Sequence, residues 1–123
     1  MKFLLDTNIV IAATLGLSRA LERRLEASNE GDLVTSTIVL AEVMYGTMRG
    51  RPRALEALEL FLEQVPAIPF DRAAADAYAT MPFKRGGFDR LIAAHALSRH
   101  LIIVTENVTD FADSGLMVEN WLA

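Results

Sequence analysis

The chain has 123 residues, which is enough for one compact domain over residues 1–123 and leaves little room for a second. It contains no cysteine, so disulfide frameworks, zinc–thiolate sites and thiol nucleophiles are excluded. The formal net charge of -4 argues against non-specific nucleic-acid binding, and a hydrophobic content of 52% is sufficient for a well-packed core.

The first half of the chain alternates short apolar runs with amphipathic segments. In chain order the predicted elements are a strand at 2–6, a helix beginning in the run 9–15, a helix at 19–29 capped by Ser18, a strand at 33–35, a helix from Ser36 or Thr37 to about 48, and a helix at 53–64. The amino-terminal run has neither the shape of an export signal nor the roughly 20 apolar residues of a membrane span. We therefore expect a cytoplasmic protein that does not enter the membrane.

The second half continues the alternation. Its predicted elements are a strand at 67–70, a helix from the cap Asp71 to about 80, a basic loop at 82–87, a helix at 88–99, a strand at 101–104, a loop or short helix at 105–113 and a strand at 116–118. The proline within 67–70 favours an edge position for that strand. Strands that alternate with helices predict an α/β domain with a mostly parallel sheet.

Three acidic residues interrupt or adjoin apolar runs. These are Asp6, Glu42 and Asp89. Burial of an unpaired carboxylate is very costly, and no lysine or arginine lies within the runs around Asp6 and Glu42. A bound divalent cation is the economical explanation, and oxygen ligands favour Mg²⁺ or Mn²⁺.

The topology predicts that these acids converge. In open parallel sheets the functional cleft lies beyond the carboxyl ends of the strands. Asp6 ends the first strand, and Glu42 and Asp89 lie on helices that start at that edge. The residues that follow the strand at 101–104 are Thr105, Asn107 and Asp110. Such a cluster suits metal-assisted hydrolysis of a phosphodiester bond.

Each acid also has a local explanation that needs no metal. Asp89 can be a helix N-cap, Asp6 can belong to an ordinary turn at the end of a strand, and Glu42 can be a solvated helix position. The basic residues are equally open: Arg49, Arg51 and Arg53, like Lys84, Arg85 and Arg90, form either patches that contact RNA or solvated loops.

The histidines and the serine offer little catalytic signal. His95 is rotated away from Asp89 on a helix, which favours packing or a surface contact, and His100 ends that helix. Ser36 has no histidine at a telling spacing, so a hydrolase triad has little support. Tyr45 and Met48 follow Glu42 along its helix and are typical of a core or a dimer interface.

Four segments together resemble the motifs of PIN-domain nucleases. They cover the chain in order and read LLDTNIV at 4–10, STIVLAEVMYG at 36–46, FDRLIAAHAL at 88–97 and VTEN at 104–107. The resemblance implies a three-layer α/β/α sandwich around a short parallel sheet and an endoribonuclease that uses Mg²⁺ or Mn²⁺. It also places Asp6, Glu42 and Asp89 at the core acidic positions, with Asp6 and Asp89 as direct metal ligands.

The resemblance assigns further roles. Thr7 supports the site through its hydroxyl and, with Arg49, Arg51 and Arg85, is a candidate contact for the RNA substrate. A fourth catalytic acid is often found in this family where this chain has Asn107, so the fourth position falls to Asn107 or to the nearby Asp110.

Among PIN domains the chain is most similar to the VapC toxins of type II toxin–antitoxin pairs. That similarity implies a VapB-type antitoxin as partner, and a homodimer or a toxin–antitoxin hetero-oligomer. Two other functions compete with a toxin nuclease. A receiver-type domain also has an acidic magnesium pocket but needs a lysine after a late strand, and the only lysines, Lys2 and Lys84, are not so placed. A PIN-like binding module that has lost catalysis is the remaining alternative.

Overall fold

The computed structural model of the chain describes residues 1–50, 54–82 and 87–122. Its centre is a five-stranded sheet in the order β3-β2-β1-β4-β5, in which all four pairings are parallel. The strands are β1 (Phe3–Leu5), β2 (Leu33–Ser36), β3 (Ala67–Ile68), β4 (Ile102–Val104) and β5 (Val118–Glu119). The predicted parallel sheet is confirmed, and β3 lies at an edge as its neighbouring proline suggested.

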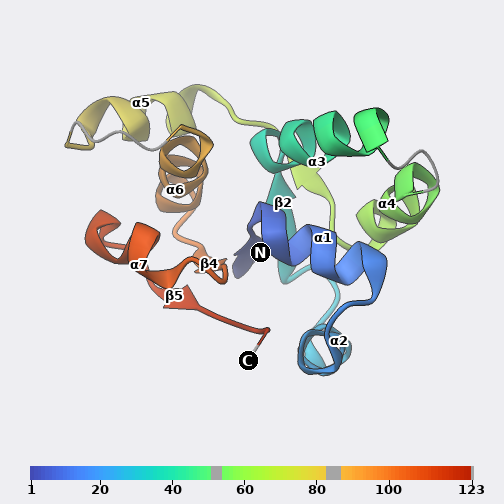
Figure 1. Cartoon of the computed structure of the whole chain (residues 1–123). Helices are drawn as coiled ribbons and strands as arrows, with labels where there is room; N and C mark the ends of the chain where they lie inside the picture. The colour runs from blue at the N-terminus through green and yellow to red at the C-terminus, as the bar shows by residue number, and fades with distance from the viewer. Residues whose placement is uncertain (51–53, 83–86, 123) are drawn as a thin grey trace.

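Helices cover both faces of the sheet. They are α1 (Thr7–Leu15), α2 (Arg19–Ala27), α3 (Thr37–Gly50), α4 (Ala54–Gln64), α5 (Arg72–Thr80), α6 (Phe88–Ser98) and α7 (Val108–Phe111), followed by a 3₁₀ turn at Ala112–Ser114. In Figure 1, α5, α6 and α7 lie to the left of the strands, and α1 and α4 to the right. The chain order explains this division. From β1 the chain moves to β2 and then β3 at one edge of the sheet, and it later returns to β4 and β5 on the other side of β1. Right-handed crossovers that move in opposite directions across a parallel sheet place their helices on opposite faces. The predicted three-layer α/β/α sandwich is confirmed.

The predicted helix caps are also present. The Ser18 hydroxyl accepts the backbone N–H of Leu21 at 3.1 Å, and the Asp71 carboxylate accepts that of Ala74 at 3.1 Å. At the start of α3 the choice between two candidates falls to Ser36, whose hydroxyl accepts a backbone N–H two residues on at 3.0 Å. Each cap satisfies an N–H that has no partner inside its helix.

Several predicted element boundaries differ from the observed ones, most of them by one or two residues. The last strand was expected at 116–118, but β5 pairs through Val118 and Glu119 with the end of β4. The helix expected at 19–29 ends at Ala27. In the first case a short edge strand takes its register from its neighbour, so its apolar run alone does not determine which residues pair.

The core lies on both faces of the two central strands. Leu4 and Leu5 of β1 are fully buried, as are Ile103 and Val104 of β4. Successive strand side chains point to opposite faces, so burial of adjacent residues means that helices cover the sheet on each side. Across the residues that the structure describes, no helix combines the length and apolar character needed to cross a membrane.

Candidate functional site

Asp6 stands at the carboxyl edge of the sheet, between its two central strands. It follows β1, and because Leu5 pairs with Val104, its neighbour across the sheet is Thr105. The Asp6 side chain is only 2% exposed. Its Oδ1 accepts the backbone N–H of Thr7 at 2.8 Å, and its Oδ2 accepts the hydroxyl of Thr105 at 2.7 Å. The interpretation of Asp6 as part of a local turn is therefore incomplete, because its carboxylate also accepts a hydrogen bond from Thr105, which is 99 residues away in the sequence.

Glu42 is connected to this edge through Thr7. The Thr7 hydroxyl donates to Glu42 Oε1 at 2.9 Å, which joins the first turn of α1 to the middle of α3. Glu42 is half-buried, so a fully solvated position is excluded. The Thr7 hydroxyl was predicted to support the site, and in the structure it does so by orienting Glu42, a second acid near Asp6.

Asp89 lies within the first turn of α6 and does not cap it. The residue at the N-cap is Gly87, whose φ of 51° suits glycine, and no side chain caps the helix there. The alternative interpretation of Asp89 as an N-cap is thus wrong. The half-buried carboxylate remains available for another task.

The electrostatics show that the acids share one environment. Burial raises the pKa of Asp6, while hydrogen bonds from Thr105 and Thr7 oppose that rise and repulsion from Glu42 and Glu106 adds to it. Burial likewise raises the pKa of Asp89, with further repulsion from Asp6 and Asp110. Segments around β1, α3, α6 and α7 therefore meet as the topology predicted.

The donor set suits a hard divalent cation. Within residues 1–50, 54–82 and 87–122, no group of three or more His, Cys, Asp or Glu side chains is arranged so that it could hold a metal ion. Magnesium does not need such a group, since it usually keeps several waters and binds one or two carboxylates. The carboxylates of Asp6 and Asp89, which repel one another, provide that number of oxygen ligands, and a cation bound by both would relieve the repulsion. These residues fit the proposed ion.

The raised pKa of Asp89, caused by burial and by repulsion, leads to a stability prediction. A carboxyl group with a raised pKa binds its proton more tightly in the folded than in the unfolded chain, so stability falls as pH rises above the ordinary value of 3.8. Asp89→Asn removes that loss. In EDTA at about pH 7 the variant should therefore melt at a higher temperature than the unsubstituted protein, and the difference should shrink toward about pH 4. Thermal unfolding followed by circular dichroism measures this, and an equal or lower melting temperature at about pH 7 would contradict it.

The remaining predicted site residues have different positions. Asn107 precedes α7, and its backbone N–H donates to the Thr105 hydroxyl at 3.0 Å. Asp110 is exposed in the first turn of α7. Arg49 is exposed near the end of α3, whereas Arg51 and Arg85 lie outside the described residues.

The basic group around 84–90 is only partly described. Lys84 lies outside the described residues, as does Arg53 of the other group. Arg90 is buried and donates to the carbonyl of Pro82 at 2.9 Å, so it supports the fold rather than a solvated patch.

Sequence reasoning placed Thr105 at this edge and included Glu106 in a motif, but it gave neither residue a role in the site. Thr105 and Glu106 directly follow the central strand β4, which is the same position that singled out Asp6 after β1. Thr105 holds the Asp6 carboxylate, and Glu106 adds negative charge beside it. Their position after a predicted central strand was a signal for a role in the site. The acids stood out because an unpaired buried charge is costly, and this argument does not apply to an uncharged threonine.

A second surprise is a contact between Ser36 and His95. The His95 Nδ1 lies 2.7 Å from the Ser36 hydroxyl, although 59 residues separate them. Both side chains are fully buried, and burial lowers the pKa of His95. A substrate cannot reach this buried pair, so the expected packing role of His95 is confirmed. The contact joins residues 59 apart, which sequence spacing did not indicate, and its burial gives no support to a hydrolase triad.

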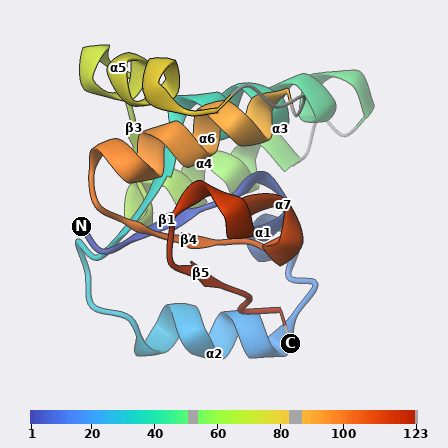
Figure 2. The ribbon, with the colours of Figure 1, turned by 90° about the vertical axis from the view of Figure 1, so that its left-hand side faces the viewer.

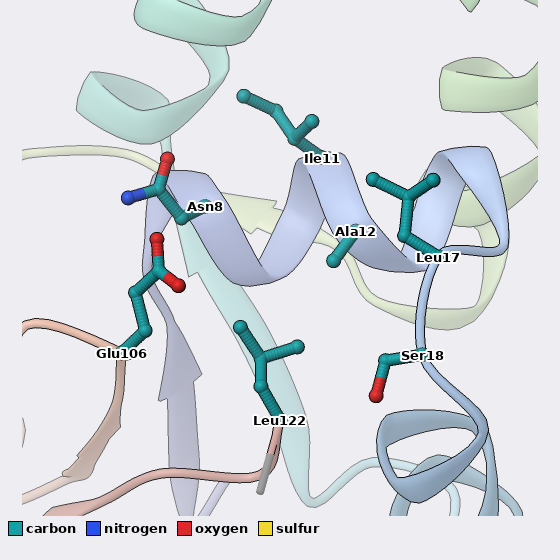
Figure 3. A pocket seen from close by; sticks show the side chains of 7 residues that line it. All are labelled: Asn8, Ile11, Ala12, Leu17, Ser18, Glu106 and Leu122. Carbon is teal, nitrogen blue, oxygen red and sulfur yellow. The ribbon is translucent and has the colours of Figure 1, made fainter.

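A cavity of about 380 Å³ adjoins the acidic edge. Figure 3 shows Asn8 and Glu106 pointing toward one another at one end of it, with the apolar side chains of Ala12, Leu17 and Leu122 farther along. Glu106 lines this cavity and also repels Asp6, so the cavity lies beside the acidic edge.

Comparison with known proteins gives a consistent result. The family model of the PIN domain matches residues 3–113. The chain is 34% identical to the tRNA(fMet)-specific endonuclease VapC of Shigella flexneri, with 98% of each chain covered. It is 29% identical to ribonuclease VapC2 of Rickettsia felis, again over 98% of each.

Solved structures agree in shape. VapBC2 from Rickettsia felis, bound to a DNA fragment from its promoter, superposes with a TM-score of 0.88 at 27% identity, covering 98% of this chain and 99% of that one. VapBC-1 from nontypeable Haemophilus influenzae superposes with a TM-score of 0.84 at 27% identity over the whole of both chains.

Proposed function

The chain belongs to the PIN domain family, and from that premise we propose that it is the toxin of a type II toxin–antitoxin pair, an endoribonuclease that hydrolyses RNA phosphodiester bonds. The observation that carries the proposal is the meeting of Asp6, Glu42 and Asp89 at the carboxyl edge of the sheet. The VapC names of its relatives support the same activity.

We propose that Asp6 and Asp89 hold a divalent cation, Mg²⁺ or Mn²⁺, assisted by Glu42. When bound, such an ion supplies positive charge that stabilises the phosphate during displacement and favours deprotonation of the attacking water. The residues of the chain prepare the site. Thr105 and the backbone of Thr7 fix both oxygens of Asp6, so this carboxylate does not reorganise during the reaction.

The other acids act around that pair. Glu42, which accepts the Thr7 hydroxyl, orients water. The fourth position falls to Asp110 in α7 or to Asn107 at its N-cap. Glu106 adds negative charge near Asp6. For the RNA itself we propose contacts with Thr7, Arg49, Arg51 and Arg85, because arginine offers paired N–H donors to phosphate oxygens.

The proposed partner is a VapB-type antitoxin. The solved structures that this fold matches are named as VapBC complexes, and the match extends over nearly the whole chain. We propose a single PIN domain over residues 1–123, acting in the cytoplasm on cellular RNA, and a homodimer that joins the antitoxin in a hetero-oligomer.

Cleavage by purified, antitoxin-free protein tests the function. The assay compares transfer, ribosomal and messenger RNA in Mg²⁺, in Mn²⁺ and in EDTA, and the transfer RNA set includes initiator tRNA because one relative is named for it. We expect cutting with either metal and none in EDTA. Cutting that persists in EDTA would contradict the metal site. Folded protein that neither cuts nor binds Mn²⁺ by calorimetry would favour the inactive binding module.

A further inference from the structure

The face of α3 that carries Glu42 also carries an aromatic and a basic side chain. Glu42, Tyr45 and Arg49 are spaced by three and four residues, so they share a side of the helix. Val43 and Thr47 point to the opposite, buried side. The Tyr45 side chain is 62% exposed, so the core role considered for it is excluded.

Tyr45 and Arg49 form a stacked pair. The guanidinium carbon of Arg49 lies 3.5 Å from the centre of the Tyr45 ring, and one guanidinium nitrogen is 3.4 Å from the Tyr45 carbonyl oxygen. A guanidinium held flat on a ring in this way is preorganised, because part of its rotational freedom is already lost before any ligand arrives. The pair is exposed, planar and positively charged.

The fold places this pair at the acidic end of the molecule. Helices α3 and α6 contact each other. Figure 2 shows the amino-terminal end of α6, which carries Asp89, at the same end of the molecule as the carboxyl-terminal half of α3. Along α3, a rise of about 1.5 Å per residue separates Glu42 from Tyr45 by roughly 4.5 Å and from Arg49 by roughly 10.5 Å.

We propose that Tyr45 and Arg49 are a stacking platform for a nucleobase of the RNA next to the bond that is cut. This inference rests on the proposed function. Both residues lie within about two helical turns of Glu42, a separation that a few nucleotides of single-stranded RNA can span. A base offers a flat π face and its neighbouring phosphate a negative charge, and the pair offers the complement of each. Stacking tolerates any base, so the platform contributes affinity and position, not sequence choice.

Binding and cleavage measured together test the platform. The probe is a fluorescent single-stranded RNA that spans the cleavage site mapped with unsubstituted protein, and binding is followed by anisotropy in an Asp89→Asn background. Tyr45→Ala should weaken binding about tenfold, as expected for loss of one stacked base, and Tyr45→Phe should restore it. In the active protein Tyr45→Ala should raise KM by a similar factor and leave kcat nearly unchanged. Each base of the RNA is then replaced in turn by 2-aminopurine. At one position the fluorescence should be quenched by the unsubstituted protein and by Tyr45→Phe, but not by Tyr45→Ala.

The matched control is Tyr78→Ala, which removes an exposed tyrosine from α5 and should not change binding. Light scattering on each variant separates the platform from a dimer contact. Two outcomes would contradict the platform. In one, Tyr45→Ala abolishes self-association; in the other, the variant still cuts RNA with unchanged binding and KM. If the unsubstituted protein cuts no RNA, the proposed function itself fails, so the two failures are distinguishable.

Discussion

Asp89→Asn is expected to reduce RNA cleavage by roughly a thousandfold while leaving the fold intact. The carboxylate lies in the first turn of α6, where Asp6 repels it, and it does not cap the helix, so its loss should not unfold α6. Loss of one of two negative ligands weakens the hold on the cation, and a thousandfold loss corresponds to about 4 kcal/mol of transition-state stabilisation. Single-turnover cleavage with saturating Mn²⁺ measures the effect, and calorimetry measures Mn²⁺ binding to the same sample.

A matched control is Asp76→Asn, which removes an exposed carboxylate from α5, where it pairs with Arg72 on the surface. Such surface pairs contribute little to stability, so cleavage should stay near the unsubstituted rate. Asp6→Asn should be as inactive as Asp89→Asn, but with an additional cost to folding. Each oxygen of Asp6 accepts one hydrogen bond, and the amide nitrogen that replaces one oxygen can only donate. Near-normal cleavage by either variant would refute the proposed metal ligands.

Thr105→Val is expected to reduce cleavage by about 10-fold to 100-fold, the range for groups that orient a metal ligand. Valine keeps the shape and β-branching of threonine but removes the hydroxyl that donates to Asp6 and accepts the backbone N–H of Asn107. The loss should raise the pKa of Asp6 further, because a hydrogen bond that favours its ionised form disappears. Cleavage should therefore also require a higher pH or a higher Mn²⁺ concentration for half-maximal rate.

Thr105→Ser restores the hydroxyl and should recover most of the activity. Thr80→Val makes the same chemical change at an exposed threonine at the end of α5 and should have no effect. The comparison separates orientation of Asp6 from a general loss of stability, since only the former shifts the pH and metal dependence. A Thr105→Val protein with the pH profile and metal requirement of the unsubstituted protein would show that Asp6 does not depend on this bond.

The elements of the fold were largely readable from local patterns. The caps Ser18 and Asp71 marked the starts of α2 and α5, and dense apolar runs marked β1 and β4. The errors occurred where local preference is weak. The last strand has only two paired residues at an edge, so its register depends on β4 and not on its own sequence.

The sequence by itself determined the chemical inventory of this protein: buried acids without local counter-ions, no cysteine, and strands whose carboxyl ends would carry Asp6 and the residues after Val104. Only the tertiary structure decided which of these groups touch. It paired Asp6 with Thr105, Glu42 with Thr7 and Ser36 with His95. The physical reason is that strand order and helix packing bring together residues far apart in the chain, and no periodicity of a single segment encodes that choice.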